Sequence, residues 1–253
     1  MNRALGRYTK MLKTIKLLLL ICGILIAKFS MADNKIVIAD YMAYPPYKIG
    51  DAGLVKEFSA LLQEELPAID FKYQRLSKKR LMVMIEKGTP LIIPLSLKFW
   101  FDEGAGLEDS AVLAEEGVYA ISHKDNPVSI DEIGVKSLMF LGRVDYKYHV
   151  IDDLVNAQKL KRYSCRNENL CLIMVLAGRG DFAVMPEYVF EQYLEQQPTM
   201  RTQLHKSKKP LFIQRRSILL HQLDSQTTQT IKQYAKALQQ SDKWLSLKAK
   251  YQL

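Results

Sequence analysis

The chain has 253 residues, with 36 Lys and Arg against 27 Asp and Glu and a formal net charge of +9. Hydrophobic residues make up 48% of it, and the 221 residues after the first 32 can bury one large core or two modest ones. Residues 1–32 hold six of the basic residues and none of the acidic ones. The other 221 residues are therefore close to neutral, at 30 basic against 27 acidic residues, which argues against a nucleic-acid partner.

The first 32 residues predict a cleavable export signal. A basic stretch from Arg3 to Lys16 precedes an apolar run of eleven residues, Leu17 to Ala27, and the small residues that end at Ala32 follow. A membrane anchor is the alternative, but a spanning helix requires about 20 apolar residues. We expect cleavage after Ala32 and a mature protein in the periplasm, with translation starting at Met1 or Met11.

Apolar runs separated by turn residues predict strands that alternate with helices, and hence an α/β protein with largely parallel sheets. In the first half, strands are predicted at 36–39, 71–73 and 91–93, and helices at 55–66 and 81–86. A strand at 115–122 follows. The second half then repeats this plan, with strands at 137–141, 162–165 and 181–185 and helices at 148–159 and 168–177. Two strands, 211–214 and 217–220, and two helices, around 231–238 and 244–251, complete the chain.

Cysteine usage is compatible with export. Cys22 is lost with the signal, which leaves Cys165 and Cys171 with five residues between them. In an oxidising compartment this pair predicts either a local disulfide or two buried thiols. The four histidines are scattered and form no metal-ligand pattern with the cysteines, so no metal or other cofactor is expected.

Three loops that follow predicted strands carry aromatic and charged side chains, which suit the wall of a ligand site. Simple packing is the alternative for the aromatic residues, and surface ion pairing for the charged ones. The loop after 137–141 also leads into a helix, where backbone N–H groups bind anions. The candidates in these loops are Tyr44, Tyr47, Lys98, Phe99, Trp100, Arg143, Asp145 and Tyr146.

The order of these features resembles the periplasmic solute-binding protein family, type 2, and especially the branch that serves polar amino acid ABC transporters. The resemblance covers residues 35–250, and it is the order and spacing of weak motifs that carry it. The matching segments are Tyr44–Tyr47 with Gly53–Leu54, Arg80–Gly88, Glu115–Pro127, Ser129–Ile133, Gly178–Asp181 and Trp244–Leu253.

This resemblance implies a two-lobed periplasmic binding protein type II fold, in which each lobe is a mainly parallel sheet flanked by helices and the ligand cleft lies between the lobes. Lobe 1 would be residues 33–122 plus 207–253, and lobe 2 would be residues 123–206. The implied partners are a small-molecule ligand and an inner-membrane ABC permease, and the protein would act as a monomer.

Two anchors of the family's amino-acid binders are not evident in this chain. The arginine that grips the ligand carboxylate after the third strand is replaced by Leu97–Phe101, where Lys98 offers charge without the guanidinium fork. At the place of the aspartate that binds the ligand amine stands Pro186, followed by Glu187, which completes the candidate list. Either the ligand is not an α-amino acid, or the site has been rebuilt, or binding has been lost. We predict a small polar or aromatic metabolite as the ligand, with an amino-acid-like ligand as an alternative.

Two other functions stay open. The first is a periplasmic sensing module that signals to a membrane receptor. An enzyme is disfavoured, because no nucleophile elbow, phosphate loop or zinc motif occurs. The acidic pairs Glu115–Glu116 and Asp152–Asp153 are adjacent rather than on a shared helical face, so we interpret them as solvated charges.

Overall fold

The structure is a computed structural model that describes residues 35–101, 103–144 and 146–253. Residues 36–253 form one compact unit. The predicted signal peptide lies outside the described residues.

Within these ranges the chain forms ten strands and seven α-helices. The strands are β1 (Ile36–Asp40), β2 (Phe71–Arg75), β3 (Leu91–Ser96), β4 (Leu107–Asp109), β5 (Ala114–His123), β6 (Leu138–Arg143), β7 (Leu160–Cys165), β8 (Phe182–Pro186), β9 (Leu204–Lys206) and β10 (Phe212–His221). The helices are α2 (Leu54–Glu65), α3 (Lys78–Glu86), α4 (His149–Asn156), α5 (Glu168–Leu176), α6 (Glu187–Gln196), α7 (Ser225–Leu238) and α8 (Asp242–Lys250).

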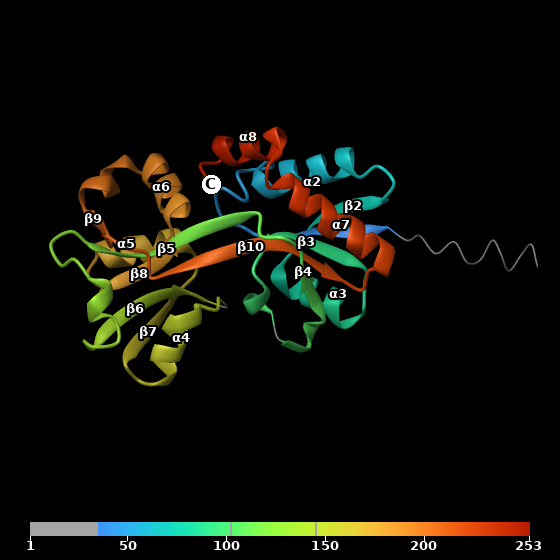
Figure 1. Cartoon of the computed structure of the whole chain (residues 1–253). Helices are drawn as coiled ribbons and strands as arrows, with labels where there is room; N and C mark the ends of the chain where they lie inside the picture. Colours follow the sequence, from blue (N-terminus) through green and yellow to red (C-terminus); the bar gives the residue numbers. More distant parts are fainter. Residues whose placement is uncertain (1–34, 102, 145) are drawn as a thin grey trace, which may run out of the picture. The chain divides into compact units, whose positions relative to one another are not determined.

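The strands hydrogen-bond in the order β2-β1-β3-β10-β5-β8-β6-β7, with β4 on β10 and β9 on β5. β1 pairs in parallel with β2 and β3, and β6 pairs in parallel with β7 and β8. β5 and β10 run antiparallel to their neighbours, and Figure 1 shows them as two long strands side by side. The predicted parallel sheets are therefore joined through an antiparallel pair.

Continuous apolar runs explain the central strands. Every residue of β1 and β3 is buried, as expected for parallel strands that are covered on both faces. Helix α2 places its buried side chains at helical spacing and covers this part of the sheet with Phe58, which also contacts the fully buried Trp244 of α8 at 5.2 Å between ring centroids. The two C-terminal helices thus fold back onto the N-terminal part of the sheet.

β10 differs from the prediction. Two strands were expected at 211–214 and 217–220, whereas the structure has one ten-residue strand. Its first half pairs with β5 through Phe212 to Arg216, and its second half pairs with β3 from Ser217 onward. The register with β3 shifts between Ser217 and Leu219, which marks the point where the strand passes from one set of partners to the other.

Helix α6 and the short strands β4 and β9 were not predicted. α6 follows Pro186 directly and buries an apolar face that includes Tyr188 and Val189. The other predicted strands and helices are present with small differences at their ends. The lobe boundaries at 122/123 and 206/207 remain predictions, and we use lobe 1 and lobe 2 below for those ranges.

Candidate functional site

The loop between β1 and α2 directs two tyrosines inward. Tyr44 is 5% exposed and Tyr47 is fully buried, and their rings meet edge to face at 5.3 Å between centroids. Gly53 closes this loop with a φ of 127°, and a Cβ at that position would lie 2.3 Å from the carbonyl oxygen of Tyr47. Only glycine fits there, so the loop shape that turns the tyrosines inward depends on this residue.

A buried ion pair lies beside Tyr47. Arg216 of β10 donates from Nε to Oε1 of Glu116 on β5 at 2.6 Å, and the two side chains are 0% and 1% exposed. Tyr47 donates its hydroxyl proton to the same carboxylate oxygen at 2.5 Å. The interpretation of Glu116 as a solvated charge was therefore wrong.

The guanidinium of Arg216 lies against two aromatic rings, 4.5 Å from the centroid of Tyr47 and 5.0 Å from that of Trp100. Its Nη1 donates to the carbonyl oxygen of Leu95 at 3.0 Å. Burial is the largest single effect and lowers the pKa of Arg216, but the Glu116 carboxylate and the neighbouring tyrosine hydroxyls together outweigh it, and the pKa is raised well above its usual value. Arg216 is therefore a permanent cation.

A bulge in β3 provides that carbonyl. Pro94 has no N–H to donate to the ladder, and Leu95 takes a φ of 51°, which is uncommon for a residue with a side chain. The interruption coincides with the register shift between β3 and β10. Local backbone strain at Leu95 thus accompanies a hydrogen bond to a buried charge.

Tyrosines of lobe 2 contact those of the β1–α2 loop. The hydroxyl of Tyr146 lies 3.1 Å from that of Tyr44, and the hydroxyl of Tyr188 lies 2.7 Å from that of Tyr47. Trp100 also meets the ring of Tyr146, at 5.0 Å between centroids. Burial raises the pKa of Tyr146 and Tyr188 well above the usual tyrosine value, so these hydroxyls stay protonated at neutral pH.

A second ion pair borders this cluster. Arg143, at the end of β6, donates from Nη1 to Oε1 of Glu168 at 3.0 Å, and its guanidinium lies 5.5 Å from the ring centroid of Tyr146. Glu168 begins helix α5 and is itself buried. Each of the two arginines in the cluster is thus paired with one carboxylate.

These side chains leave little open space among themselves. The cavity that they line has a volume of about 20 Å³, which is enough for about one water molecule. Apolar side chains line part of it, and polar groups from both lobes line the rest. Its lining residues are Tyr44, Val118, Tyr146, Tyr148, Glu168, Val184, Met185, Pro186, Val189, Phe212 and Gln214. A separate pocket of about 330 Å³ is lined by Lys98 and Phe99 in lobe 1 and by Val150 in lobe 2.

The structure brings together five of the predicted site residues, which are Tyr44, Tyr47, Trp100, Arg143 and Tyr146.

The other predicted residues lie apart from this cluster. The Lys98 side chain is 55% exposed and lies 3.9 Å from the carboxylate of Asp109. Phe99 is half-buried with its ring centroid 6.0 Å from that of Trp100, and Glu187 pairs with Lys206. Asp145 lies outside the described residues.

Sequence reasoning missed four members of the cluster, Glu116, Glu168, Tyr188 and Arg216. A signal for two of them was present, because Glu115–Glu116 and Arg215–Arg216 each fall within a predicted strand or at its edge. Neighbouring residues of a strand point to opposite faces, so one member of each pair is expected to point inward.

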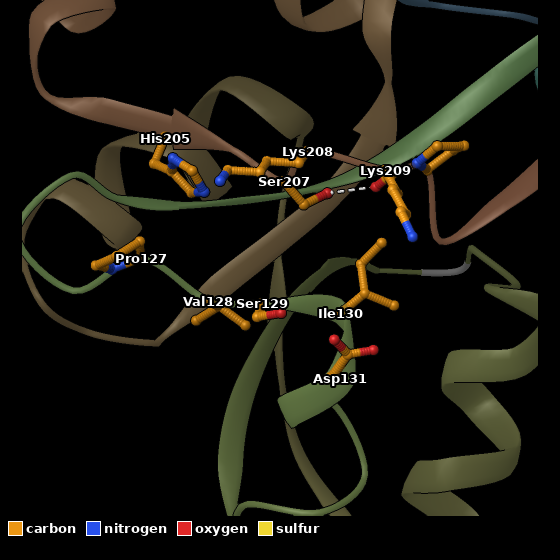
Figure 2. Close-up of a pocket in the computed structure, with 10 residues that line it drawn as sticks. Pro127, Val128, Ser129, Ile130, Asp131, His205, Ser207, Lys208 and Lys209 are labelled. Atoms are coloured by element: carbon orange, nitrogen blue, oxygen red, sulfur yellow. Dashed lines mark hydrogen bonds between the residues drawn. The ribbon is translucent and has the colours of Figure 1, made fainter.

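A larger cavity of about 490 Å³ lies at the point where the chain leaves lobe 2 and returns to lobe 1 (Figure 2). It lies between residues 127–131, which follow β5, and residues 205–210, which lead into β10. None of the predicted site residues lines it. Lys208, Lys209 and His205 give its rim a basic character, with Asp131 opposite.

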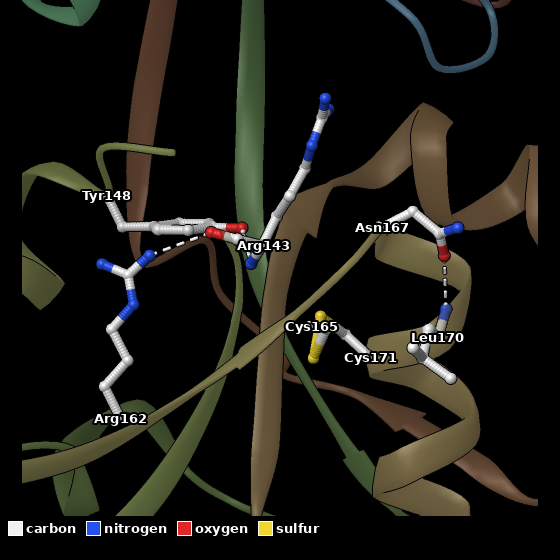
Figure 3. Close-up of a disulfide and its surroundings, with 7 residues drawn as sticks. All are labelled: Arg143, Tyr148, Arg162, Cys165, Asn167, Leu170 and Cys171. Atoms are coloured by element: carbon white, nitrogen blue, oxygen red, sulfur yellow. Dashed lines mark hydrogen bonds between the residues drawn. A yellow bond between two sulfur atoms is a disulfide. The ribbon is translucent and has the colours of Figure 1, made fainter. Parts of the chain in front are cut away.

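Cys165 and Cys171 form a disulfide with 5.5 Å between their Cα atoms, which decides between the two predicted states (Figure 3). It joins the end of β7 to the first turns of α5. Cys165 is the register partner of Arg143 on β6, and the carbonyl of Arg143 accepts a hydrogen bond from Arg162 at 2.9 Å. The disulfide therefore lies on the strand next to Arg143, and Glu168 falls within the loop that it closes.

Among the described residues no group of His, Cys, Asp and Glu side chains could hold a metal ion. In the same ranges, no helix combines the length and apolar character needed to cross a membrane.

The sequence matches no protein-family model and no curated protein. Solved structures do match. The GluR0 ligand-binding core in complex with L-glutamate is 13% identical with a TM-score of 0.68, and the match covers 86% of this chain and 97% of that one. A histidine kinase sensor domain with similarity to periplasmic binding proteins is 15% identical with a TM-score of 0.67, covering 86% and 95%.

The substrate-binding protein of an amino acid ABC transporter is 13% identical with a TM-score of 0.63, covering 85% of this chain and 98% of that one. At these identities the matches define the fold. They are all two-lobed modules matched over nearly their full length. The chain therefore has the two-lobed α/β fold of the periplasmic binding proteins, as its sequence predicts.

Proposed function

We propose that this chain is an exported, non-enzymatic binding protein whose two lobes close on a small polar or aromatic solute. One observation carries the proposal. Tyrosines far apart in the sequence, Tyr44 and Tyr47 in lobe 1 and Tyr146 and Tyr188 in lobe 2, meet directly between the lobes. A cleft lined by aromatic rings with a few polar groups is the usual form of a small-molecule site.

The chemistry of the lining supports a solute with both polar and apolar parts. Glu168 and Gln214 offer acceptor oxygens at the small cavity, while Val184 and Val189 offer an apolar wall. Since the cavity has room for about one water, a solute enters only when the lobes separate and the tyrosine contacts between them break. Solute capture is thus coupled to lobe closure.

The charged groups of the cluster favour binding over catalysis. Glu116 and Glu168 are each ion-paired with an arginine of this chain, so the oxygens that accept from it are already engaged. A general acid or base instead has to reach the substrate within hydrogen-bond distance.

Export is part of the proposal. Residues 1–32 have the order of a signal peptide, and a disulfide between Cys165 and Cys171 suits an oxidising compartment such as the periplasm. We propose that the mature protein acts there as a monomer and passes its solute to an inner-membrane ABC permease.

A sensing role is the alternative, in which the closed form signals to a membrane receptor. Both a transporter's binding protein and a kinase sensor domain share this fold, so the fold supports both roles equally. Neighbouring genes for a permease and an ATPase would favour transport, whereas a neighbouring receptor kinase gene would favour sensing.

The proposal is tested with protein recovered from the periplasm after expression of the full chain. Its mass reports cleavage after Ala32, and mass spectrometry of the heat-released supernatant identifies any solute that was carried along. A thermal-shift screen then covers amino acids, polyamines and small aromatic acids. A ligand present at 100 times its Kd should stabilise the protein by about 2.7 kcal/mol.

Tyr146→Ala should abolish the thermal shift, because Tyr146 lines the cavity and contacts lobe 1. Tyr163→Ala is the matched control, since Tyr163 lies on β7 and is 54% exposed. The proposal is wrong if no solute is released and no compound shifts the melting temperature, or if Tyr163→Ala reduces the shift as much as Tyr146→Ala.

A further inference from the structure

Arg216 is fully buried, and its guanidinium lies among groups that recognise a planar cation. Glu116 Oε1 and the carbonyl oxygen of Leu95 accept from two different nitrogens of its guanidinium, at 2.6 and 3.0 Å. Tyr47 and Trp100 place their rings 4.5 and 5.0 Å away. Carboxylate, carbonyl and aromatic faces together form a site for a guanidinium.

The groups of this site come from separate elements. Glu116 belongs to β5, Leu95 to the bulge of β3 and Trp100 to the short 3₁₀ turn Lys98–Trp100. Tyr47 comes from the β1–α2 loop, and Tyr188 of α6 in lobe 2 adds its hydroxyl at 3.3 Å from Arg216 Nη2. The guanidinium therefore joins both lobes through one set of contacts.

The neighbouring pair shows that this arrangement is not a general property of the two strands. Arg215 and Glu115 occupy the preceding positions of β10 and β5 and also form an ion pair, with Nε and Oε1 2.9 Å apart. Their side chains are 69% and 59% exposed, whereas those of Arg216 and Glu116 are 0% and 1% exposed. The same charge pair thus occurs twice, once in solvent and once inside the aromatic site.

Of the three guanidinium nitrogens of Arg216, Nη2 has the longest hydrogen bonds to oxygen. Arg216 Nη2 has three oxygen neighbours, Tyr188 Oη, Gln214 Oε1 and Tyr44 Oη, at 3.3, 3.4 and 3.5 Å. Two of these residues, Tyr44 and Gln214, also line the small cavity. The side of the guanidinium that faces the cavity therefore has the weakest contacts.

We infer that the cleft contains a binding site for a planar cation which the chain fills with its own Arg216, so that this side chain holds the lobes together and excludes guanidinium and ammonium solutes from the site. The inference rests on the proposed function only in placing the captured solute beside Arg216, at the cavity side of Nη2. In the wild-type protein an acceptor group of the solute contacts Nη2 of Arg216. A cationic solute cannot pair with Glu116, because Arg216 already does.

Chemical rescue tests this site directly. Arg216→Ala removes the guanidinium and leaves Glu116, Tyr47 and Trp100 in place, so the variant should have a lower melting temperature than the wild type. Added ethylguanidinium should raise that melting temperature in a saturable way, and ethylurea, which has a similar shape without the charge, should not. Ethylguanidinium should cause no comparable rise in the wild type or in Arg215→Ala, the matched control.

The inference is overturned if ethylguanidinium raises the melting temperatures of Arg216→Ala, Arg215→Ala and the wild type equally, if ethylurea rescues as well, or if no rescue occurs. Small-angle scattering adds a second readout. The radius of gyration of Arg216→Ala should exceed that of the wild type and return toward it with ethylguanidinium.

Arg216→Lys covers the case in which Arg216→Ala yields no folded protein. Lysine keeps the charge but cannot reach Glu116 and the Leu95 carbonyl at once, so its melting temperature should fall well below that of Arg215→Lys. Equal melting temperatures would overturn the inference. Rescue is measured without any solute, so its failure is separate from a failure of the solute screen.

Discussion

The two adjacent ion pairs between β5 and β10 allow one prediction to be worked out in detail. Glu116→Gln keeps the size of the side chain but leaves the Arg216 charge buried without a counter-charge. Removing one partner of a buried pair costs about 3–5 kcal/mol, because the remaining charge stays desolvated. Against the 5–15 kcal/mol by which domains are stable, this loss is large.

Glu115→Gln is the matched control, because it makes the same chemical change one residue earlier on the same strand. The side chains of Glu115 and Arg215 are 59% and 69% exposed, so water replaces the lost partner. Exposed ion pairs contribute about 0–1 kcal/mol. The two substitutions should therefore differ by at least about 2 kcal/mol in the free energy of unfolding.

Urea unfolding followed by circular dichroism measures both values, and similar m-values would show that the unfolding transition exposes the same surface. A third variant, Glu116→Leu with Arg216→Met, removes both charges and should recover most of the loss, because a buried pair can be replaced by apolar groups at little cost. Equal losses for Glu115→Gln and Glu116→Gln would refute the reasoning, as would a double variant that is less stable than Glu116→Gln.

Three further predictions concern the disulfide, the buried tyrosines and the β1–α2 loop. Replacing Cys165 and Cys171 with alanine should lower the free energy of unfolding by about 2 kcal/mol, which is the chain-entropy value for so short a loop. Adding reductant to the wild type should cause the same loss in urea unfolding, and an unchanged free energy of unfolding would contradict the prediction. Burial raises the pKa of Tyr188 well above its usual value of 10 in the folded state, so its contribution to stability is complete below pH 10 and falls by about 1.4 kcal/mol per pH unit above it. Tyr188→Phe should reduce that alkaline slope in urea unfolding by the same amount, and an unchanged slope would count against the assignment. Gly53→Ala should cost about 3 kcal/mol because its Cβ meets the Tyr47 carbonyl, whereas Gly50→Ala, with a φ of 57° and open space around it, should cost about 1 kcal/mol; equal midpoints in thermal unfolding would exclude this explanation.

Much of the fold could be predicted because the central strands are short apolar runs bounded by turn residues. Ile36–Ala39 and Leu91–Ile93 are buried on both faces, so their sequence alone marks them as strands of a covered sheet. The single strand β10 could not be recognised in this way. Arg215 and Arg216 interrupt its apolar pattern, and the reason that Arg216 fits in the core lies 100 residues away in Glu116.

The site was predictable to the extent that it follows strand ends. Tyr44 and Tyr47 follow β1, and Trp100 follows β3, where loops of parallel strands form ligand sites. Tyr188 could not be found by this rule, since it belongs to a helix that the sequence did not mark clearly. Its contact with Tyr47 depends on how helix α6 and the distant β1–α2 loop are brought together.

The position of β10 has a consequence for the order of folding. It is the last described strand in the sequence, yet it lies between β3 and β5 in the sheet. During synthesis, which begins at the N-terminus, one edge of β3 therefore stays unpaired until residues 217–221 are present. In the folded protein every residue of this strand is buried. Such edges readily pair with other chains, and contacts over this sequence separation form slowly. The sheet of lobe 1 is thus completed only after all of lobe 2 has been synthesised.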